Sequence, residues 1–569
     1  MEKVLSLGAQ IKIPARAGGV NNGGLALSTD QNSLYVVLNI ANTIGVIDLR
    51  TNTFMRSIAV GNAPKSITIV GNLAYVTNQG GRPARPGEFT DLSVGTAVAA
   101  DRESAASVTG TVSVVNLSTQ AVIRNIPVGL QPTAILASGG YVFVANSNSD
   151  SVSVIDSKMN ALIEALHIQA FLNAPFGSSP NWLAMTSRND LVVTLGANNA
   201  AAFYRWTDRR LKFEGFVPTA WYPASAAIAA ALTAKQTGAS QPERTIVANT
   251  KGTAVGSSVP NERIPSGKNT HTFVGSVSII PVPTTAKFYE YDAQVAVNNG
   301  WKEHGGSEHT PLPFRDHRLI QHVFYVIKEN RTYNQILGDD PRGNGDPNLV
   351  QFGSRVTPNQ HALADNFVLF DNFYDSGVLS ADGHQHRLTV RIYGEFAFRF
   401  NRPAREFGNW TSWYGDSLIL EGKKAGQLHV PLGRFKVSPD VPSFEEHLNP
   451  DFPNFNTGIP DQYRSDVFLR DFQSYVKNGN LPDLIVMTLR TDHTSRTSAG
   501  YPTPASQIAD NDLAVGRLVD AISHSPYWAN SAIFFVEDDP QSGTDHVDGH
   551  RSTAFIASPY IRRTQVNHT

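Results

Sequence analysis

The chain has 569 residues, a formal net charge of −2 and no cysteine. That length is too great for one hydrophobic core and predicts two or more domains, whereas the lack of cysteine excludes disulfides, thiolate metal sites and a cysteine nucleophile. Basic residues are scattered, so we expect no nucleic-acid partner, and neither a membrane span nor a signal-peptide pattern is present in the sequence.

Residues 1–284 repeat a pattern of short strands. One strand type occurs at Leu73–Asn78 and again at Val142–Asn146, and a second type occurs at Thr43–Asp48. Self-similar units of several strands at a period of roughly 40–50 residues are typical of β-propeller blades. The strand Tyr75-Val-Thr-Asn resembles the repeat of the YVTN-type propeller family.

About five blades can be counted, fewer than a closed propeller of this kind normally has. We therefore expect an incomplete propeller whose N-terminus lies inside a longer protein, with an open blade edge near residues 1–40. Gly80–Ser107 is rich in Gly, Ala, Arg and Pro and predicts a long surface loop. Because propellers host binding and structural roles alike, the propeller could hold a protein or surface ligand.

Residues 285–318 predict a helix followed by a linker. Ala286–Gly300 has a helical pattern that ends at Asn-Gly, and a polar stretch follows. The linker histidines lack regular spacing and are expected to be solvated rather than metal ligands: His304, His309 and His317. The second domain then covers residues 319–569.

The second domain opens with Val323–Ile327, a β-branched and aromatic run that predicts a strand buried on both faces of a parallel sheet. Similar runs lie at Phe367–Phe370, Leu481–Leu489 and Ser531–Val536, and a helical pattern lies at Pro504–Ser523. Alternating strands and helices predict an α/β layer fold with a mainly parallel sheet. Each of these four runs is followed by Asp, Glu, Asn or His at what should be one ligand-binding edge.

The polar residues after these strands are mostly oxygen ligands. Glu329 and Asn330 follow the first strand, and Asp538 and Asp539 follow the fourth. A glutamate at the end of a strand forms a loop salt bridge about as often as it serves in a site. Adjacent carboxylates at a buried strand end, however, repel each other unless a cation lies between them. The sequence therefore predicts a metal-dependent hydrolytic site.

Ser380 stands in a loop that leads through Asp382-Gly-His384 towards a helix. A hydroxyl placed there meets amide N–H groups and the helix dipole, which favour an anionic group beside it. A serine that only caps the helix would have the same sequence signature. Both interpretations stay open from these residues alone.

Four segments in this order, KENRTYNQ, DNF to SADGH, TDHTS and EDD to DHVDGH, resemble the phosphoesterase family that includes bacterial acid phosphatases and phospholipases C. That family belongs to the alkaline-phosphatase-like superfamily, and the resemblance covers about residues 319–561. It implies a multidomain β + α/β chain, with the incomplete propeller followed by an alkaline-phosphatase-like α/β sandwich domain. Fusions of this kind are commonly exported, which implies a periplasmic or extracellular location.

The resemblance also implies roles for single residues. The metal ligands would be Glu329, Asn330, Ser380, Asp538 and Asp539, the last in place of the family's Glu. Further candidate ligands are Asp492, His384 and His550. Ser380 would be the nucleophile that forms a phosphoseryl intermediate. His546 or His493 would protonate the leaving group or complete a second metal site.

The expected activity is hydrolysis of a phosphate ester, either a monoester, a diester or a phospholipid. Oxygen ligands favour Ca, Mg or Mn, whereas added histidines favour Zn or Mn. Two alternatives remain. One is a propeller-based binding or surface protein with a degenerate phosphoesterase domain, and the other is a sulfatase or mutase on the same fold.

Two expectations concern the rest of the second domain. Tyr393–Tyr463 is rich in Phe, Trp and Pro with little periodicity and predicts an insertion that could wall a substrate pocket. The chain is also expected to be a fragment at its C-terminus, because it stops after a last predicted strand, Thr553–Ala557, with no helix to cover it. We therefore expect exposed apolar surface around Phe555 and Ile556.

Overall fold

A computed structural model describes residues 10–14, 22–93, 96–102, 106–168, 177–229, 232–233, 240–241, 243–252, 268–270, 274–301, 319–375, 377, 404–407, 449, 451–453, 455–540 and 543–568. The chain divides into two compact units. The N-terminal unit comprises Met1–Thr253 and Gly275–Gly306, and the C-terminal unit comprises Ala254–Val274 and Ser307–Thr569.

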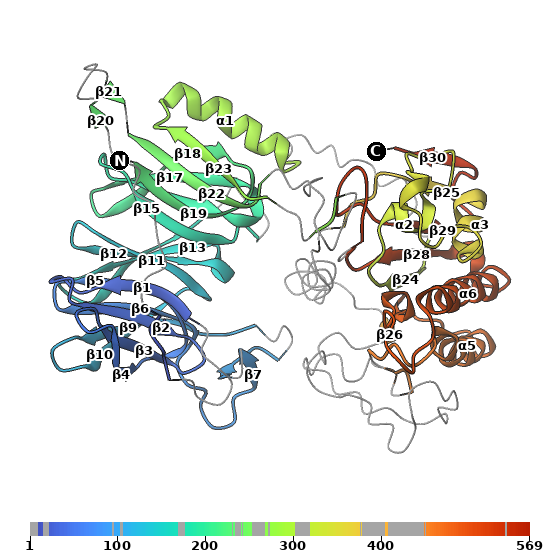
Figure 1. Cartoon of the computed structure of the whole chain (residues 1–569), viewed down its shortest axis with the longest axis horizontal. Coiled ribbons are helices and arrows are strands. Elements are labelled where there is room, and N and C mark those ends of the chain that lie inside the picture. The colour runs from blue at the N-terminus through green and yellow to red at the C-terminus, as the bar shows by residue number, and fades with distance from the viewer. Residues whose placement is uncertain are drawn as a thin grey trace. The chain divides into compact units, whose positions relative to one another are not determined.

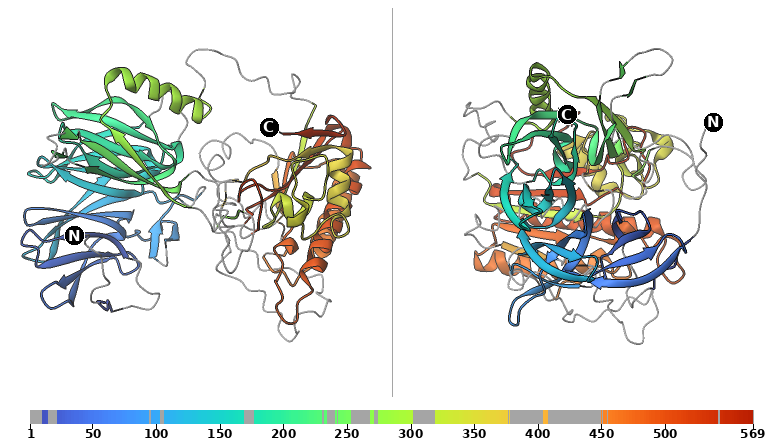
Figure 2. Two further views of the ribbon diagram at one scale, coloured as in Figure 1. Left: turned by 45° about the horizontal axis from the view of Figure 1, so that its top comes forward. Right: turned by 90° about the vertical axis from the view of Figure 1, so that its left-hand side faces the viewer.

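The described part of the N-terminal unit contains five antiparallel sheets of three or four strands that follow one another along an arc (Figures 1 and 2). Their strand orders are β1-β2-β3-β4, β10-β9-β6-β5, β11-β12-β13-β14, β15-β16-β17-β18 and β19-β22-β23. The strands are β1 (Asn22–Leu27), β2 (Ser33–Leu38), β3 (Thr43–Asp48), β4 (Thr53–Ala59), β5 (Asn62–Val70), β6 (Leu73–Gly81), β9 (Gly110–Asn116), β10 (Ala121–Val128), β11 (Pro132–Ser138), β12 (Tyr141–Asn146), β13 (Ser151–Asp156), β14 (Ala161–His167), β15 (Pro180–Met185), β16 (Asp190–Leu195), β17 (Ala200–Thr207), β18 (Arg210–Pro218), β19 (Trp221–Ala229), β22 (Arg244–Gly252) and β23 (Ser276–Pro281).

Successive sheets pack through their first strands, with β1 beside β5, β5 beside β11, β11 beside β15 and β15 beside β19. This is the arrangement of propeller blades, and the repeated strands predicted from the sequence are β3, β6 and β12. The predicted loop Gly80–Ser107 contains a small hairpin of β7 (Thr90–Ser93) and β8 (Thr96–Ala99). Another short hairpin joins β20 (Leu232–Thr233) to β21 (Ser240–Gln241).

A buried asparagine lies in the second strand of three sheets, and its hydrogen bonds explain why this residue recurs in the repeat. Asn78, Asn146 and Asn249 each donate hydrogen bonds from Nδ2 to hydroxyl groups on the neighbouring strand. The shortest of these bonds are 2.9 Å to Ser113, 3.0 Å to Ser153 and 2.9 Å to Ser278, respectively. The Nδ2 donors of these buried amides are thus paired, whereas none of the three Oδ1 atoms has a hydrogen-bond partner among the described residues.

The helix predicted after the last blade strand is α1 (Thr285–Asn298), which packs on β18. Phe288 is buried against that strand, where a Cβ at Gly215 would lie 2.5 Å from the Phe288 ring. The close approach explains why residue 215 is a glycine. The Asp292 carboxylate also accepts a hydrogen bond of 2.6 Å from the Phe216 amide.

The C-terminal unit is built on a sheet of order β26-β27-β24-β28-β29. Its strands are β26 (Ala404–Phe407), β27 (Leu484–Thr488), β24 (His322–Lys328), β28 (Ser531–Glu537) and β29 (Ala554–Ala557). β24 lies at the centre and is parallel to β27 and β28, whereas β29 is antiparallel to β28. The mainly parallel sheet predicted from the apolar runs is therefore present.

Helices cover one face of this sheet with a large apolar core. They are α2 (Tyr333–Leu337), α3 (Pro358–Asn366), α5 (Asp461–Asn478) and α6 (Pro504–Ser523). Phe324 and Val326 of β24 point into this core, whereas Tyr325 and Ile327 belong to a smaller cluster on the other face. The α6 helix has the predicted bounds, but α5 was not predicted.

Two predictions about this sheet are wrong. The run at Phe367–Phe370 forms β25 (Val368–Phe370), which pairs with β30 (Gln565–Asn567) in a separate small sheet. Three of the four predicted strand ends, rather than all four, thus belong to the main sheet. Phe555 is only 2% exposed and Ile556 is half-buried, because α3 and β25 pack on β29.

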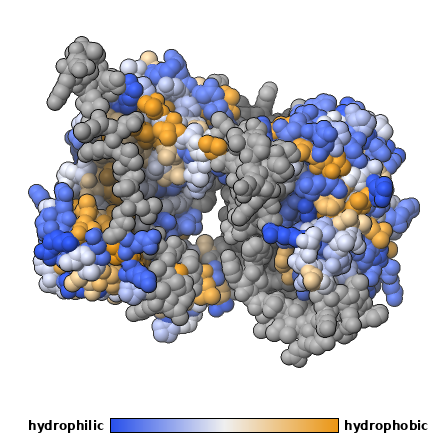
Figure 3. Space-filling model, in the orientation of Figure 1, coloured by the Kyte–Doolittle hydropathy of each residue, from blue (hydrophilic) through white to orange (hydrophobic). Residues whose placement is uncertain are grey.

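Figure 3 shows hydrophobic residues interspersed with hydrophilic residues on the visible face of both units. The exposed apolar side chains include Leu25, Trp221 and Val277 in the N-terminal unit and Leu513 in the C-terminal unit. Among the described helices, none is long and apolar enough to cross a membrane.

Candidate active site

The carboxyl ends of β24, β27 and β28 meet at one edge of the main sheet. The parallel register sets Lys328 of β24 directly opposite Glu537 of β28. The residues that follow these strands are buried although they are polar or charged: Glu329, Asn330, Arg490, Asp492, Asp538 and Asp539. Burying so many charged groups is costly unless they compensate one another, so their contacts define the site.

Asn330 joins the ends of β24 and β28. Its amide N–H donates to Asp538 Oδ1 at 3.3 Å, and its side-chain Nδ2 donates to Asp539 Oδ2 at 2.8 Å. The backbone of Asn330 has φ = 64°, a left-handed conformation in which asparagine is among the better tolerated residues. In turn, the Asp538 amide donates to Lys328 O at 3.0 Å. The structure therefore brings together three of the predicted metal ligands.

Glu329 lies next to Asn330 and forms a buried ion pair. Arg490 NH1 donates to Glu329 Oε1 at 2.8 Å, and both side chains are 1% exposed. The Glu329 amide donates to Asp492 Oδ1 at 3.0 Å. The structure thus confirms that Glu329 forms a salt bridge. Its role as a metal ligand stays a prediction.

Lys328 is fully buried between two carboxylates. Its Nζ lies 2.6 Å from Glu537 Oε1 and 3.3 Å from Asp492 Oδ2. Burial by itself would lower the pKa of Lys328, but the charges of Glu537 and Asp492 outweigh it and raise the pKa. Burial and the charge of Glu537 raise the pKa of Asp492 well above its ordinary value. Lys328 therefore holds the ends of three strands together.

Asp461, the first residue of α5, holds the segment that carries Asp492 and His493. Its carboxylate accepts hydrogen bonds from the amides of Arg490 and Thr491 at 3.0 and 2.9 Å. These bonds fix the short 3₁₀ turn Thr491–His493. The charge of Asp461 is balanced by Arg464, whose NH1 lies 2.9 Å away.

His493 is half-buried on the same turn. Its Nδ1 lies 2.9 Å from Thr494 O, and its ring packs edge-on against Phe455. Arg331 donates hydrogen bonds to the carbonyls of Asp492 and His493. His493 therefore lies beside the strand ends, as its predicted role requires.

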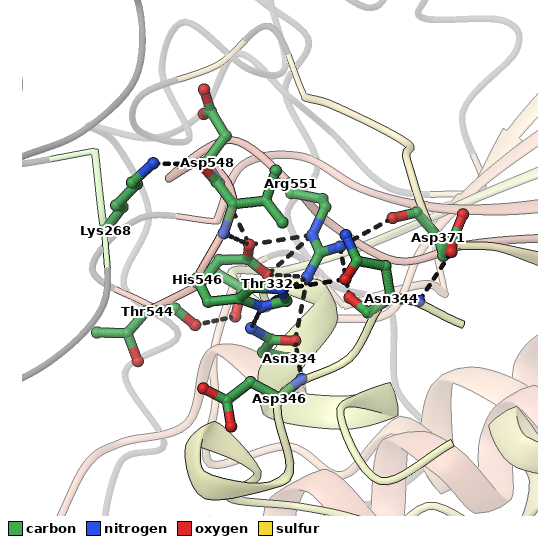
Figure 4. A network of polar contacts seen from close by, with 12 residues as sticks. Lys268, Thr332, Asn334, Asn344, Asp346, Asp371, Thr544, His546, Asp548 and Arg551 are labelled. Carbon is green, nitrogen blue, oxygen red and sulfur yellow. Dashed lines mark hydrogen bonds and ion pairs between the residues drawn. The ribbon is translucent and has the colours of Figure 1, made fainter. Parts of the chain in front are cut away.

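His546 lies in a different polar network, which is drawn in Figure 4. Its ring contacts Asn334, Asn344 and Arg551. None of these three residues belongs to the group formed by Asn330, Asp538 and Asp539. His550 is buried and its Nδ1 lies 3.0 Å from Asp548 Oδ1. The structure thus places His546 and His493 in separate polar networks.

Arg551 is the centre of the network around His546. Its Nε and NH2 groups donate to the Asp545 carboxylate at 3.0 Å, and both side chains are fully buried. NH1 donates to the backbone carbonyls of Asn344 and Asp371 at 2.8 and 3.1 Å. These bonds join the segment after β28 to the loops that follow α2 and β25.

A short segment distant in sequence also supports this network. The backbones of Lys268 and Asp545 exchange hydrogen bonds of 2.7 and 2.9 Å, and Lys268 Nζ donates to Val547 O at 2.8 Å (Figure 4). A Cβ at Gly549 would lie 2.5 Å from the Asn269 backbone. Residues 268–270 therefore pack closely on the segment that carries His546.

Two of the predicted site residues cannot be placed. Ser380 and His384 lie outside the described residues. The nucleophile and its distance from Asn330 therefore stay predictions.

The donor set fits a divalent cation in its chemistry. Asn330, Asp538 and Asp539 supply buried carboxylate and amide oxygens, the ligands that Ca²⁺, Mg²⁺ and Mn²⁺ prefer. Within the described residues, no three Asp, Glu or His side chains form a ready-made metal-binding group. A complete site would therefore need further ligands, for which the predicted Ser380 is a candidate.

The sequence analysis missed several residues that organise the site: Lys328, Asp461, Arg490 and Arg551. For Asp461 a signal exists, because Pro460-Asp461 is a typical helix start and Gly479 a typical helix end. For the three basic residues, nothing in the local pattern distinguishes a buried cation from a solvated one.

No curated protein matches the sequence. Among solved structures, Kuenenia stuttgartiensis hydrazine synthase is 17% identical with a TM-score of 0.29, and the match covers 46% of this chain and 63% of that chain. A streptogramin B lyase is 13% identical with a TM-score of 0.28 and coverage of 47% and 70%. U3-55K is 10% identical with a TM-score of 0.30 and coverage of 46% and 68%. Similarities this weak support no inference about function.

The C-terminal unit gives a clear result. Residues 346–569 match the Phosphoesterase family. The matched range includes Ser380, Asp492, Asp538, Asp539 and His546, whereas Glu329 and Asn330 precede it. The C-terminal unit therefore carries a domain that matches the Phosphoesterase family.

Proposed function

We propose that this chain is a metal-dependent phosphoric ester hydrolase that uses Ser380 as its nucleophile. Its substrate would be a phosphomonoester, a phosphodiester or a phospholipid. The observation that carries the proposal is the contact of Asn330 with both Asp538 and Asp539 at the carboxyl edge of the sheet. The family match supports the reaction class, and the buried oxygen donors support the metal.

Asn330, Asp538 and Asp539 would hold the cation, with Glu329 and Ser380 as further ligands. A divalent cation bound there supplies Lewis-acid polarisation of a phosphoryl oxygen. The identity of the ion follows from its ligands: Ca, Mg or Mn for oxygen ligands alone, and Zn or Mn if a histidine is added. Asp492 is engaged by Lys328 and the Glu329 amide, and is therefore a weaker candidate ligand than Asp538 and Asp539.

The remaining chemistry belongs to the side chains. The Ser380 hydroxyl, after losing its proton to solvent, would attack phosphorus in line with the leaving group, so that a new P–O bond forms as the ester P–O bond breaks. Water would then cleave the phosphoseryl bond, which releases the phosphate product and restores the Ser380 hydroxyl. A histidine would supply the proton that the leaving oxygen needs. His493 lies on the turn held by Asp461 beside the strand ends, which favours it over His546 for this step.

We also infer an exported protein, periplasmic or extracellular, whose propeller unit could hold a protein or surface ligand. Only the resemblance to exported propeller–phosphoesterase fusions supports this inference. Fractionation of cells that express the complete gene tests the location. Recovery in the cytoplasm would refute it.

The nucleophile is tested by Ser380→Ala. We expect turnover of a chromogenic phosphomonoester or phosphodiester to be lost, while folding and bound metal are retained. If Ser380 only caps a helix, the variant loses about 0.5–2 kcal/mol of stability and keeps its activity. Ser506→Ala is the matched control, because Ser506 is exposed in the first turn of α6.

The metal site is tested by Asp539→Asn, with metal content and activity measured together. Even residues that only support metal ligands typically change affinity or activity by about 10–100-fold, so loss of a ligand should cost at least about 100-fold. Asp520→Asn removes an equal charge from the exposed part of α6 and should change neither quantity. Full activity and metal content in Asp539→Asn would refute the proposed site.

A further inference from the structure

The ring of His546 lies in a polar cage formed by Asn334, Asn344 and Arg551, and its two nitrogens face different residues of this cage (Figure 4). Its Nδ1 lies 2.7 Å from Asn334 Nδ2, and its Nε2 lies 3.3 Å from Asn344 Oδ1. A neutral imidazole carries a proton on only one of these nitrogens. Which one carries it follows from the partners of Asn334.

The orientation of the Asn334 amide is determined by two donors. Its Oδ1 accepts hydrogen bonds from Arg551 NH2 at 3.1 Å and from the Asp346 amide at 3.0 Å. A guanidinium and a backbone N–H can only donate. The amide cannot be flipped without placing N–H against N–H, so Nδ2 must face His546.

The Nδ1 atom of His546 is therefore an acceptor. It faces the N–H of Asn334 and, at 3.4 Å, Arg551 NH2. A proton on Nδ1 would face two donors and no acceptor. The proton must then be on Nε2, which agrees with Asn344 Oδ1, an acceptor, on that side.

The cage itself is rigid, because Arg551 cannot move without breaking its contacts. Its guanidinium is held by the Asp545 carboxylate and two backbone carbonyls, and it stacks 4.6 Å from the Tyr333 ring centroid. Asn334 lies in α2, whose start is fixed by a reciprocal capping box between Thr332 and Gln335. The side of the ring that faces Asn334 is thus preorganised.

We infer that Asn334 is a positioning residue that holds His546 as the tautomer with its proton on Nε2. His546 then presents an N–H donor at Nε2, which suits an oxygen of the phosphoryl group, while its unprotonated nitrogen, Nδ1, faces Asn334 and Arg551 rather than a metal ion. This inference rests on the proposed phosphoester hydrolysis and assigns His546 to substrate contact rather than to a second metal site.

The test replaces the donor by an acceptor with Asn334→Asp. The carboxylate keeps an oxygen for Arg551 and the Asp346 amide, but it offers Nδ1 of His546 an acceptor in place of a donor. Nitrogen NMR of full-length protein labelled at histidine measures the tautomer, and the His546 signal is identified by its loss in His546→Gln. We expect the Nε2–H form in the wild type and a proton on Nδ1 in Asn334→Asp.

The matched control is Asn366→Asp, which makes the same change at an exposed position whose Nδ2 donates a hydrogen bond to Ala362 O. It should leave the His546 signal unchanged. A wild-type signal of the Nδ1–H form, or the same signal in Asn334→Asp as in the wild type, overturns the inference. Because this readout needs no turnover, it decides the tautomer even if the chain hydrolyses no phosphate ester.

Measurements of activity and metal content then decide whether His546 donates a hydrogen bond to the substrate or binds a metal ion. Removing one hydrogen-bond donor from a transition state typically costs about 10²–10³-fold in turnover, and we expect an effect of about 10–100-fold for His546→Gln at this half-buried position. Bound metal should be unchanged. Loss of metal from His546→Gln would make His546 a ligand and overturn its assignment as a donor.

Discussion

The two units bury polar groups in different ways. In the N-terminal unit the recurrent buried group is a neutral amide that pairs with hydroxyls nearby, as Asn146 does with Ser151 and Ser153 across one hairpin. In the C-terminal unit the buried groups carry charge and join distant segments. Lys328 pairs with Glu537, 209 residues away, and Glu329 pairs with Arg490, 161 residues away.

The difference reflects what each arrangement can do. A buried amide whose donors are paired carries no charge, so its burial costs less than that of an ion and it can recur in a repeated fold. Buried charges cost much more, and replacing them with apolar groups is often neutral or stabilising. Charges that persist at a sheet edge therefore point to function. The contrast leads to three predictions.

The largest effect is expected for Lys328→Met. The variant leaves Glu537 and Asp492 facing each other without their cation, which should destabilise the C-terminal unit by about 3–5 kcal/mol. Denaturant unfolding followed by amide hydrogen exchange in β24 measures it. The control Lys212→Met breaks an exposed ion pair with Asp208 and should cost at most about 1 kcal/mol. Equal losses in the two variants would remove the contrast between buried and exposed charge.

A smaller effect is expected for Asn146→Ala in the N-terminal unit. The variant removes the hydrogen bonds that Asn146 Nδ2 donates to Ser151 and Ser153 and should cost about 2 kcal/mol of stability there, measured by amide hydrogen exchange in β12 and β13. Hydrolysis of phosphate esters should be unchanged, because the amide serves the fold. Asn72→Ala is the control, since Asn72 is exposed. A loss of turnover in Asn146→Ala would show that the N-terminal unit takes part in catalysis.

The smallest effect concerns Asp510, whose carboxylate accepts a hydrogen bond from the Asp461 amide at 2.6 Å. Burial and the charge of Asp461 raise its pKa to about 6. The folded state therefore binds this proton more tightly than the unfolded chain, so the contribution of Asp510 to stability is greatest at low pH and falls as pH rises from about 4 to about 6.

Asp510→Asn should abolish this slope and stabilise the C-terminal unit by about 1–2 kcal/mol above pH 6 relative to the wild type. Stability measured between pH 4 and pH 8 checks it. The control Asp466→Asn changes an exposed residue that pairs with Arg517 and should keep the slope. The same pH dependence of stability in the wild type and in Asp510→Asn would contradict the role of Asp510.

Sequence patterns predicted strands and helices well where a local property of the sequence decides the secondary structure. The β-branched run at Val323–Ile327 and the apolar face of Pro504–Ser523 became β24 and α6. Helix α5 was missed although Tyr463, Val467 and Phe468 have helical spacing, because it adjoins a long stretch without periodicity. The predicted insertion Tyr393–Tyr463 overlaps only the first three residues of α5, and the helical pattern after it was overlooked.

Strand partners could not be predicted in the same way. The β25 run has the composition of a core strand, yet it pairs with β30 outside the main sheet. Phe555 was expected to be exposed because no helix follows it, but α3, which precedes it by almost 200 residues, packs on its strand. Partners at such distances leave no local signal.

The sequence by itself determined that carboxylate and amide side chains follow the strands of this domain, because short apolar runs and the polar residues after them are local features. Only the tertiary structure decided which of these residues meet. Asn330 turns to Asp538 and Asp539, whereas Glu329 turns to Arg490. The physical reason is that a buried charge must find its compensation within reach. Which groups are within reach depends on strand register and on residues such as Lys328 and Asp461, whose burial no local pattern reveals.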